Sequence, residues 1–194
     1  IPMKNVLILG ASGTIARHVY DLLINNSSIQ LTLFLRNARR LRKNNVARAQ
    51  IIEGDVLNYT QLKEAMFGQE IVYVNLAGEL GNMVKNIVRA MEETQLKRII
   101  FISSIGIYDV PMKSVLEQYR KASDIIESSE LDYTILRPAW FTATDEVDYE
   151  ITTKGEPEKG SVISQRSLAT FISKLIEDPQ INVRQNLGIN KPNS

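Results

Sequence analysis

The chain has 194 residues, of which 44% are hydrophobic and 23% charged, and its formal net charge is +1. This profile is typical of one globular domain, and the balanced charge excludes any general argument for direct binding of nucleic acid or membrane. The absence of cysteine excludes disulfides, thiol catalysis and thiolate metal sites, and no apolar run approaches the roughly 18 residues of a membrane span. We therefore expect a soluble cytoplasmic protein without a metal site. Ile1-Pro2 before Met3 has the form of an expression remnant, so the predicted domain is 3–194.

Short apolar runs alternate with helix-like segments along the whole chain. The runs that predict strands lie at 5–9, 30–35, 49–53, 71–75, 98–102 and 133–137. The helical patterns lie near 14–25, 38–44, 58–66, 81–94, 113–128 and 167–177. Because nearly continuous apolar strands separated by amphipathic helices form parallel sheets covered on both faces, the sequence predicts a single doubly wound α/β domain.

Two later segments carry separate expectations. The helical pattern at 113–128 has an apolar stripe that predicts its core-facing side, formed by Val115, Tyr119, Ala122 and Ile126. The polar segment 142–166 follows the last predicted strand, near the sheet edge where ligands bind in doubly wound folds. It is either a lid or substrate wall, or an ordinary surface loop with a short strand at 149–153.

A glycine-rich turn joins the first predicted strand to the first predicted helix. Gly10 permits a tight turn, Gly13 lets the backbone approach a pyrophosphate, and the small Ala16 lets the helix pack close to the sheet. Backbone N–H groups at the helix start would then face the phosphates, and Ser12 and Thr14 add hydroxyl donors. This setting of strand, loop and helix predicts a dinucleotide-binding site.

The residues after the second predicted strand indicate which dinucleotide binds. An NAD site places an acidic residue there for the ribose 2′-hydroxyl, but no Asp or Glu occurs from Leu22 to Ile52. The same stretch carries six cations, namely Arg36, Arg39, Arg40, Arg42, Lys43 and Arg48. Arg36 stands at the expected position of the acid, where a guanidinium suits a 2′-phosphate. NADP(H) is therefore favoured over NAD(H), while Arg42, Lys43 and Arg48 also fit a solvated surface.

Three further polar residues have local interpretations. Asp55, after the third predicted strand, either contacts the adenine or acts in a turn, with Asn58 capping the next helix. His18 is the only histidine, and we expect it on the surface of the first helix, because no partner for catalysis or metal binding can be placed beside it.

Five stretches together resemble a known family. They are VLILGASGTIA (6–16), LFLRNARR (33–40), EGDVLNYTQL (53–62), RIIFISSIGIYD (98–109) and SSELDYTILRPAWF (128–141). The chain resembles, over at least 4–178, the atypical short-chain dehydrogenases/reductases. More narrowly it is similar to the NmrA-like NAD(P)-binding proteins, which themselves resemble the flavin reductase biliverdin reductase B. This resemblance implies a Rossmann-like sheet with strand order 3-2-1-4-5-6, a short seventh strand, and an NADP(H) site in the crevice.

The resemblance also assigns roles to individual positions. It places phosphates at Gly10, Ser12, Gly13, Thr14 and Ile15, the 2′-phosphate at Arg36, and the adenine at Asp55 and Val56. It implies that Leu76, Ala77 and Gly78 border the cofactor, that Ser103 and Ser104 follow strand five, and that Lys121 contacts the nicotinamide ribose. Arg137, Pro138 and Ala139 match the turn beside the nicotinamide. Ser104 takes the place of the superfamily's catalytic hydroxyl.

One departure from the superfamily bears on catalysis. Its usual pair is Tyr-x-x-x-Lys, in which the lysine lowers the pKa of the tyrosine, but Glu117 stands four residues before Lys121. Tyr119 is two residues from Lys121, about 200° around a helix, so it cannot pair with Lys121 in place of that tyrosine. The usual catalytic tyrosine is therefore expected to be missing.

Two functions follow from that departure. One is an NADPH-dependent reductase of a small planar or carbonyl acceptor, with Ser104, Lys121 and a minor proton role for Glu117. Tyr108, Trp140 and Phe141 could stack on such an acceptor, with ordinary core packing as the alternative for all three, for Phe141 more than for Trp140. The other is a non-catalytic NADP(H)-binding regulator that acts through a partner protein. The sequence leaves the oligomeric state open.

Overall fold

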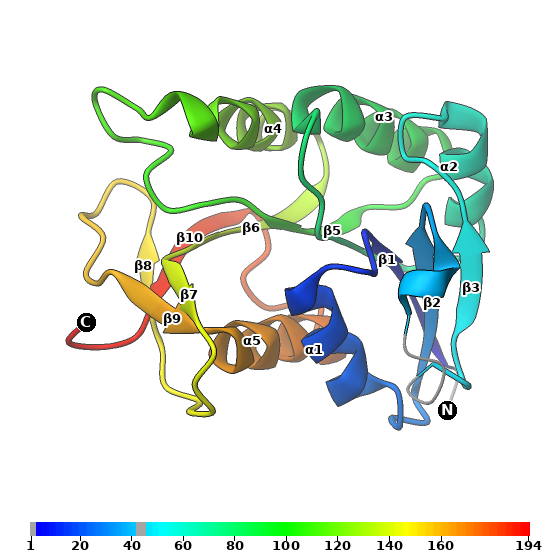
Figure 1. Cartoon of the computed structure of the whole chain (residues 1–194). Helices are drawn as coiled ribbons and strands as arrows, with labels where there is room; N and C mark the ends of the chain where they lie inside the picture. Colours follow the sequence, from blue (N-terminus) through cyan, green and yellow to red (C-terminus); the bar gives the residue numbers. More distant parts are fainter. Residues whose placement is uncertain (1–2, 42–45) are drawn as a thin grey trace.

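The computed structural model describes residues 3–41 and 46–194 (Figure 1). Its strands in the central sheet are β1 (Lys4–Leu9), β2 (Ile29–Leu35), β3 (Gln50–Glu53), β4 (Ile71–Val74), β5 (Arg98–Ile102), β6 (Asp132–Pro138), β8 (Glu150–Thr153) and β10 (Gln185–Asn190). Over the described residues the strand order is β3-β2-β1-β4-β5-β6-β10-β8, and only β8 runs antiparallel to its neighbour. The order 3-2-1-4-5-6 is thus confirmed, with the seventh position taken by β10 and a further edge strand, β8, beyond it.

Helices cover both faces of this sheet. They are α1 (Thr14–Leu23), α2 (Tyr59–Met66), α3 (Leu80–Glu93), α4 (Glu117–Glu127) and α5 (Gln165–Glu177). Figure 1 shows α1 and α5 on one face and α2, α3 and α4 on the other. Within β1, Val6 and Ile8 pack toward α1 and α5, whereas Leu7 and Leu9 pack toward the opposite helices. Because both faces of the strand are buried, its sequence is apolar at every one of these positions. The predicted single α/β domain is confirmed.

The predicted helix at 38–44 is wrong over its described part. Residues Ala38–Arg40 form a single 3₁₀ turn, η1, and Leu41 leaves it with extended backbone. The side chain of Asn37 accepts a hydrogen bond from Arg39 N, and Leu41 is buried in the core on the α1 side. Capping by Asn37 and the anchoring of Leu41 thus favour a short turn over a continued helix. Arg42 and Lys43 lie outside the described residues.

The core-facing stripe of the helix at 113–128 is also partly wrong. A 3₁₀ turn, η3 (Ser114–Leu116), precedes α4 and turns Leu116 inward. Val115 is therefore 74% exposed, while Ala122 and Ile126 are buried and Tyr119 is partly buried. The change from 3₁₀ to α geometry at residue 117 shifts the phase of the buried side.

The polar segment 142–166 is built around short strands. Strands β7 (Trp140–Thr142) and β9 (Val162–Ser164) pair in parallel as a small second sheet, and the strand expected at 149–153 is β8. The buried Ser164 hydroxyl caps α5 by accepting from Ser167 N and donates to the carbonyl of Glu146. The segment is thereby tied to the start of α5.

Every helix in residues 3–41 and 46–194 is too short or too polar to span a bilayer.

Candidate functional site

The glycine loop runs directly against the end of β4. Gly10 has φ +83°, and a Cβ there would lie 2.1 Å from the carbonyl oxygen of Asn75. A Cβ on Gly13 would lie 2.1 Å from the side-chain Nδ2 of Asn75. Gly10 therefore needs glycine for its backbone conformation and for close approach, whereas at Gly13 glycine leaves room for the Asn75 amide.

The start of α1 presents unpaired donors. Gly13 is the N-cap, it offers no side-chain hydrogen bond, and the first bond of the helix runs from Arg17 N to Gly13 O at 3.0 Å. The N–H groups of Thr14, Ile15 and Ala16 precede that bond and have no acceptor within the helix. Together with the positive end of the helix dipole, they form a site suited to phosphate.

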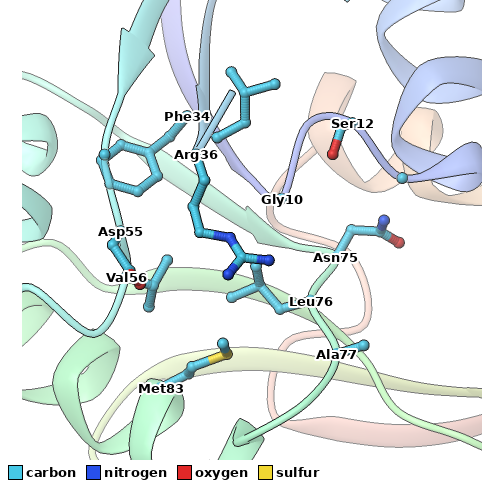
Figure 2. Close-up of a pocket in the computed structure, with 13 residues that line it drawn as sticks. Gly10, Ser12, Phe34, Arg36, Asp55, Val56, Asn75, Leu76, Ala77 and Met83 are labelled. Carbon is cyan, nitrogen blue, oxygen red and sulfur yellow. The ribbon is translucent and has the colours of Figure 1, made fainter. Parts of the chain in front are cut away.

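A cavity of about 220 Å³ lies beside this loop. It is lined by Gly10, Ser12, Gly13, Phe34, Leu35, Arg36, Gly54, Asp55, Val56, Asn75, Leu76, Ala77 and Met83. Figure 2 shows the Arg36 side chain extending from the end of β2 into this space. Arg36 makes no hydrogen bond or ion pair with any other described residue, so its guanidinium is available to a ligand.

Asp55 makes the expected turn and also borders the cavity. Its carboxylate accepts from Leu57 N at 2.9 Å, which makes a turn, and Asn58 caps α2 by accepting from Gln61 N at 3.1 Å. Asp55 and the buried Val56 also line the cavity. The turn and the contact with the cavity are therefore compatible.

The second cavity, of about 340 Å³, continues the first toward β5 and α4. It is lined by Gly13, Thr14, Ile15, Asn75, Leu76, Ala77, Ile102, Ser103, Tyr119, Phe141 and Gln165. Gly13, Asn75, Leu76 and Ala77 line both cavities. The two spaces thus form one groove, hereafter the crevice, which runs over the carboxyl ends of β2, β1, β4 and β5 from Arg36 to Tyr119. This is where the strand order reverses, the usual ligand position in such sheets.

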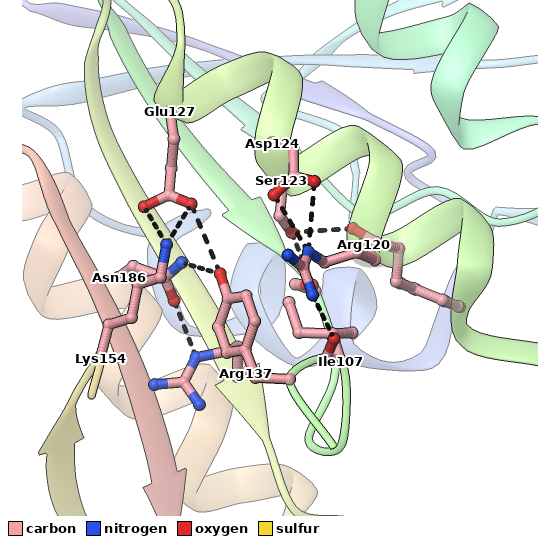
Figure 3. Close-up of polar contacts among 11 residues, drawn as sticks. Ile107, Arg120, Ser123, Asp124, Glu127, Arg137, Lys154 and Asn186 are labelled. Carbon is pink, nitrogen blue, oxygen red and sulfur yellow. Dashed lines mark hydrogen bonds and ion pairs between the residues drawn. The ribbon is translucent and has the colours of Figure 1, made fainter. Parts of the chain in front are cut away.

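Helix α4 contributes Tyr119 to the crevice. One turn later, the Ser123 hydroxyl lies 2.8 Å from both the Ser103 hydroxyl and the Tyr119 carbonyl oxygen (Figure 3). Ser103 is buried at the end of β5. Tyr119 and Ser123 are four residues apart and therefore share one face of the helix.

The structure does not bring the three expected catalytic residues to the crevice. Ser104 donates to the carbonyl of Ile105 at 2.9 Å and lines neither cavity. Glu117 and Lys121 are exposed and line an open hollow elsewhere on α4, and the Lys121 methylenes lie against Gly81. Lys121 is two residues from Tyr119 and cannot face the same side.

Arg137 and Asn186 belong to a separate polar cluster on the α4 side of the sheet (Figure 3), and Tyr108 is hydrogen-bonded to it. The Arg137 side chain is 2% exposed, pairs with Glu158 and donates to Asn186 Oδ1 at 2.8 Å. Asn186 in turn donates to the Tyr108 hydroxyl at 2.7 Å. Burial raises the pKa of both Tyr108 and Glu158. This cluster borders its own cavity of about 450 Å³, so neither residue lines the crevice.

The remaining expected residues lie as follows. Pro138 and Ala139 are buried at the end of β6, and Gly78 is exposed with φ +97° outside both cavities. Trp140 is 58% exposed, with the Lys113 ammonium 6.0 Å from its ring centre. The core position expected for Phe141 is wrong, since Phe141 is 48% exposed and lines the crevice. Phe141 belongs to β7, which is part of the small second sheet and not of the central sheet that the helices cover.

Sequence reasoning missed Asn75 and Gln165. Asn75 ends an otherwise apolar run and backs both glycines, so a polar residue at the carboxyl end of a buried strand was an available signal. Gln165 opens α5 far along the chain, where nothing in the sequence ties it to the glycine loop.

His18 lies on α1 as expected, half-buried beside Asp21 and Arg166. Over residues 3–41 and 46–194, no cluster of three or more histidine or carboxylate side chains could hold a metal.

Comparisons with known proteins agree with this geometry. A protein-family profile described as NAD(P)H-binding matches residues 10–179. A Rossmann-fold NAD(P)-binding family protein from Shigella flexneri is 46% identical, with 99% of this chain and 95% of that chain covered and a TM-score of 0.93. A short-chain dehydrogenase/reductase from Veillonella parvula in complex with NADP is 26% identical, with 98% and 95% covered and a TM-score of 0.90. Protein YmjC from Escherichia coli (strain K12) is 54% identical over 41 residues, 21% of this chain and 68% of that protein. The chain therefore belongs to the NAD(P)H-binding family of Rossmann-fold proteins.

Proposed function

We propose that this protein is an NADPH-dependent oxidoreductase that reduces a small planar or carbonyl acceptor. The observation that carries the proposal is the crevice itself, which extends from the unpaired Arg36 to Tyr119 and Phe141. Its lining suits an extended dinucleotide, with a basic group at one end and aromatic side chains at the other.

The residues at the Arg36 end fit the phosphates of NADPH. The uncapped start of α1 supplies N–H donors for the pyrophosphate, and Arg36 supplies a guanidinium for the 2′-phosphate. An acidic residue, which would repel that phosphate, is absent from the end of β2. When bound, NADPH supplies a hydride from its nicotinamide ring.

The other end of the crevice suits a flat acceptor. Phe141 offers an exposed ring for stacking, while Tyr119 and Ser103 offer hydroxyl groups. We assign Tyr119 as the group that donates a hydrogen bond or a proton to the reduced acceptor. Ser123 stands one turn after it, where the superfamily's pair has lysine. Because a serine replaces the lysine that assists proton donation in the superfamily, the site favours acceptors such as quinones or flavins, whose own rings stabilise the incoming charge.

The proposal is tested by measuring NADPH oxidation with quinones, flavins and aldehydes, beside the Kd values for NADPH and NADP⁺. Turnover with at least one planar acceptor supports a reductase. Micromolar NADPH binding without oxidation by any acceptor would contradict it.

A second candidate function is a non-catalytic NADP(H)-binding regulator. It is favoured by Glu117, which stands in place of a tyrosine four residues before Lys121, and by the apolar side chain of Val110, which is 97% exposed in the loop before η3. Binding without turnover in the same assay would support this alternative.

A further inference from the structure

The loop that carries Arg36 is crowded with unpaired positive charge. Residues 36–41, hereafter the basic loop, include Arg36, Arg39 and Arg40, all exposed, and Arg17 on α1 lies beside them. None of these four arginines forms an ion pair with a described carboxylate. Because like charges repel, contacts other than ion pairs must keep this loop in place.

Two side chains from outside the basic loop hold its backbone. Arg17 donates from Nη2 to the carbonyl oxygen of Arg40 at 2.9 Å. On the other side, Glu53 at the end of β3 accepts from Ala38 N at 3.0 Å. Neither Arg17 nor Glu53 lines the crevice.

The contact from Arg17 joins the two phosphate-facing elements. Arg17 N closes the first hydrogen bond of α1 on Gly13, so its backbone is part of the pyrophosphate-facing turn. Its side chain holds the far end of the loop that presents Arg36. The pyrophosphate site and the 2′-phosphate site are thus parts of one connected unit, which lowers the ordering cost of binding both groups.

We propose that Arg17 and Glu53 are specificity-determining positioning residues, which fix the basic loop so that Arg36 meets the 2′-phosphate of NADPH. This inference rests on the proposed preference for NADPH. It adds two residues that act through backbone contacts alone and touch no cofactor.

The test is a fluorescence titration of NADPH and NADH against wild type, Arg17→Met, Glu53→Ala and Glu53→Gln. Arg17→Met and Glu53→Ala are each expected to weaken NADPH about tenfold, as loss of one charged-group hydrogen bond would, and to leave NADH within about twofold. Simple electrostatics predicts the opposite for Glu53→Ala, because removing a negative charge should strengthen phosphate binding. Glu53→Gln keeps the acceptor oxygen and is expected to bind NADPH at least as tightly as wild type.

Double variants with Arg36→Ala show whether the effect passes through Arg36. If it does, adding Arg17→Met to Arg36→Ala changes the NADPH Kd by less than about twofold, because coupled changes are not additive. Fully additive losses would overturn the positioning role.

The remaining outcomes separate this inference from the proposed function. If Arg36→Ala removes the NADPH preference while Arg17→Met and Glu53→Ala leave the NADPH/NADH ratio unchanged, only the positioning role is wrong. If wild type binds NADPH and NADH equally, the proposed cofactor preference fails and this inference fails with it. If Arg17→Met does not fold, the two variants of the exposed Glu53, Glu53→Ala and Glu53→Gln, decide by themselves whether the positioning role holds. Thermal unfolding checks that each variant is folded.

Discussion

At the scale of single residues, a few side chains give the crevice its chemical character. Arg36 has no hydrogen-bond or ion-pair partner among the described residues. Tyr119 and Phe141 line the opposite end of the crevice, where we propose that the acceptor binds. An unpaired guanidinium facing a cavity is an arrangement suited to an anionic ligand. The glycines of the loop matter differently, since they leave room for neighbouring backbone.

Gly10→Ala is expected to destabilise the fold and to abolish NADPH binding. The new Cβ would lie 2.1 Å from Asn75 O at a residue with φ +83°, so strain and collision combine. We expect a loss of about 3 kcal/mol or more in the free energy of unfolding, measured with urea. Gly68→Ala is the matched control, because Gly68 has φ +80° with nothing within 4 Å of its Cβ. It should lose only about 1–2 kcal/mol. Equal losses for both variants would show that the contact with Asn75 is unimportant.

Tyr119→Phe and Lys121→Ala separate the structural assignment from the one implied by family resemblance. Tyr119 lines the crevice and Lys121 does not. With aldehyde acceptors, Tyr119→Phe should lower kcat by about 10² or more, the contribution of a positioned proton donor. With flavins or quinones, the loss should be much smaller. Lys121→Ala should change neither kcat nor the NADPH Kd by more than about twofold, as expected of a surface change. The reverse pattern would restore the role of Lys121.

At the scale of elements, helix α4 shows how far sequence reasoning reached. Its apolar periodicity placed Tyr119 on the inward face, whereas the family resemblance placed Lys121 there. Two residues separated by about 200° cannot both face the sheet, and the structure follows the periodicity. The predicted stripe nevertheless began wrongly at Val115, because the apolar pattern does not reveal the 3₁₀ turn before α4.

The sequence did not predict strand β10, for a physical reason different from the one in α4. The strands β1 to β6 were predicted because their sequences are short apolar, β-branched runs, but β10 was not located. Its sequence, QNLGIN, places Asn186 and Asn190 in buried positions. They are satisfied there by hydrogen bonds with Arg137, Tyr108 and Glu150. A strand that buries polar groups against partners distant in sequence has no local signal.

The contact between α2 and α3 gives a prediction about pH. Hydrogen bonds from Lys63 above all, and from Arg89, lower the pKa of Glu93 to about 2. A carboxyl with a lowered folded-state pKa adds stability above its ordinary pKa, and that stability is lost as pH falls toward the folded value. Glu93→Gln should therefore be less stable than wild type above pH about 5, and the difference should vanish near pH 2 in urea unfolding series.

The control for this pH prediction is Glu64→Gln. Glu64 is an exposed glutamate on α2 that forms no ion pair or hydrogen bond with another described residue. It should show no such pH-dependent difference. Because the Glu93 carboxylate is solvent-facing, added salt should reduce the effect. A difference for Glu93→Gln that is constant with pH would contradict an ionic origin.

At the scale of the whole molecule, the topology assembles the crevice. The carboxyl ends of β2, β1, β4 and β5 meet where the strand order reverses, and they bring together residues from 10 to 165. The glycine loop and Arg36 were predictable because the motif and its spacing are local. The opposite end was predicted only in part: Phe141 was expected to stack on an acceptor, whereas Tyr119 and Gln165 come from separate helices whose phases only the packed structure fixes.

The central claim is that this crevice holds NADPH by its 2′-phosphate, and the most direct measurement compares the Kd values of NADPH and NADH for wild type and Arg36→Ala. Wild type is expected to bind NADPH more tightly than NADH. Arg36→Ala should weaken NADPH by about 1.5–3 kcal/mol, the worth of a hydrogen bond to a charged group, and leave NADH nearly unchanged. Equal losses for the two cofactors, or no loss for either, would contradict the account.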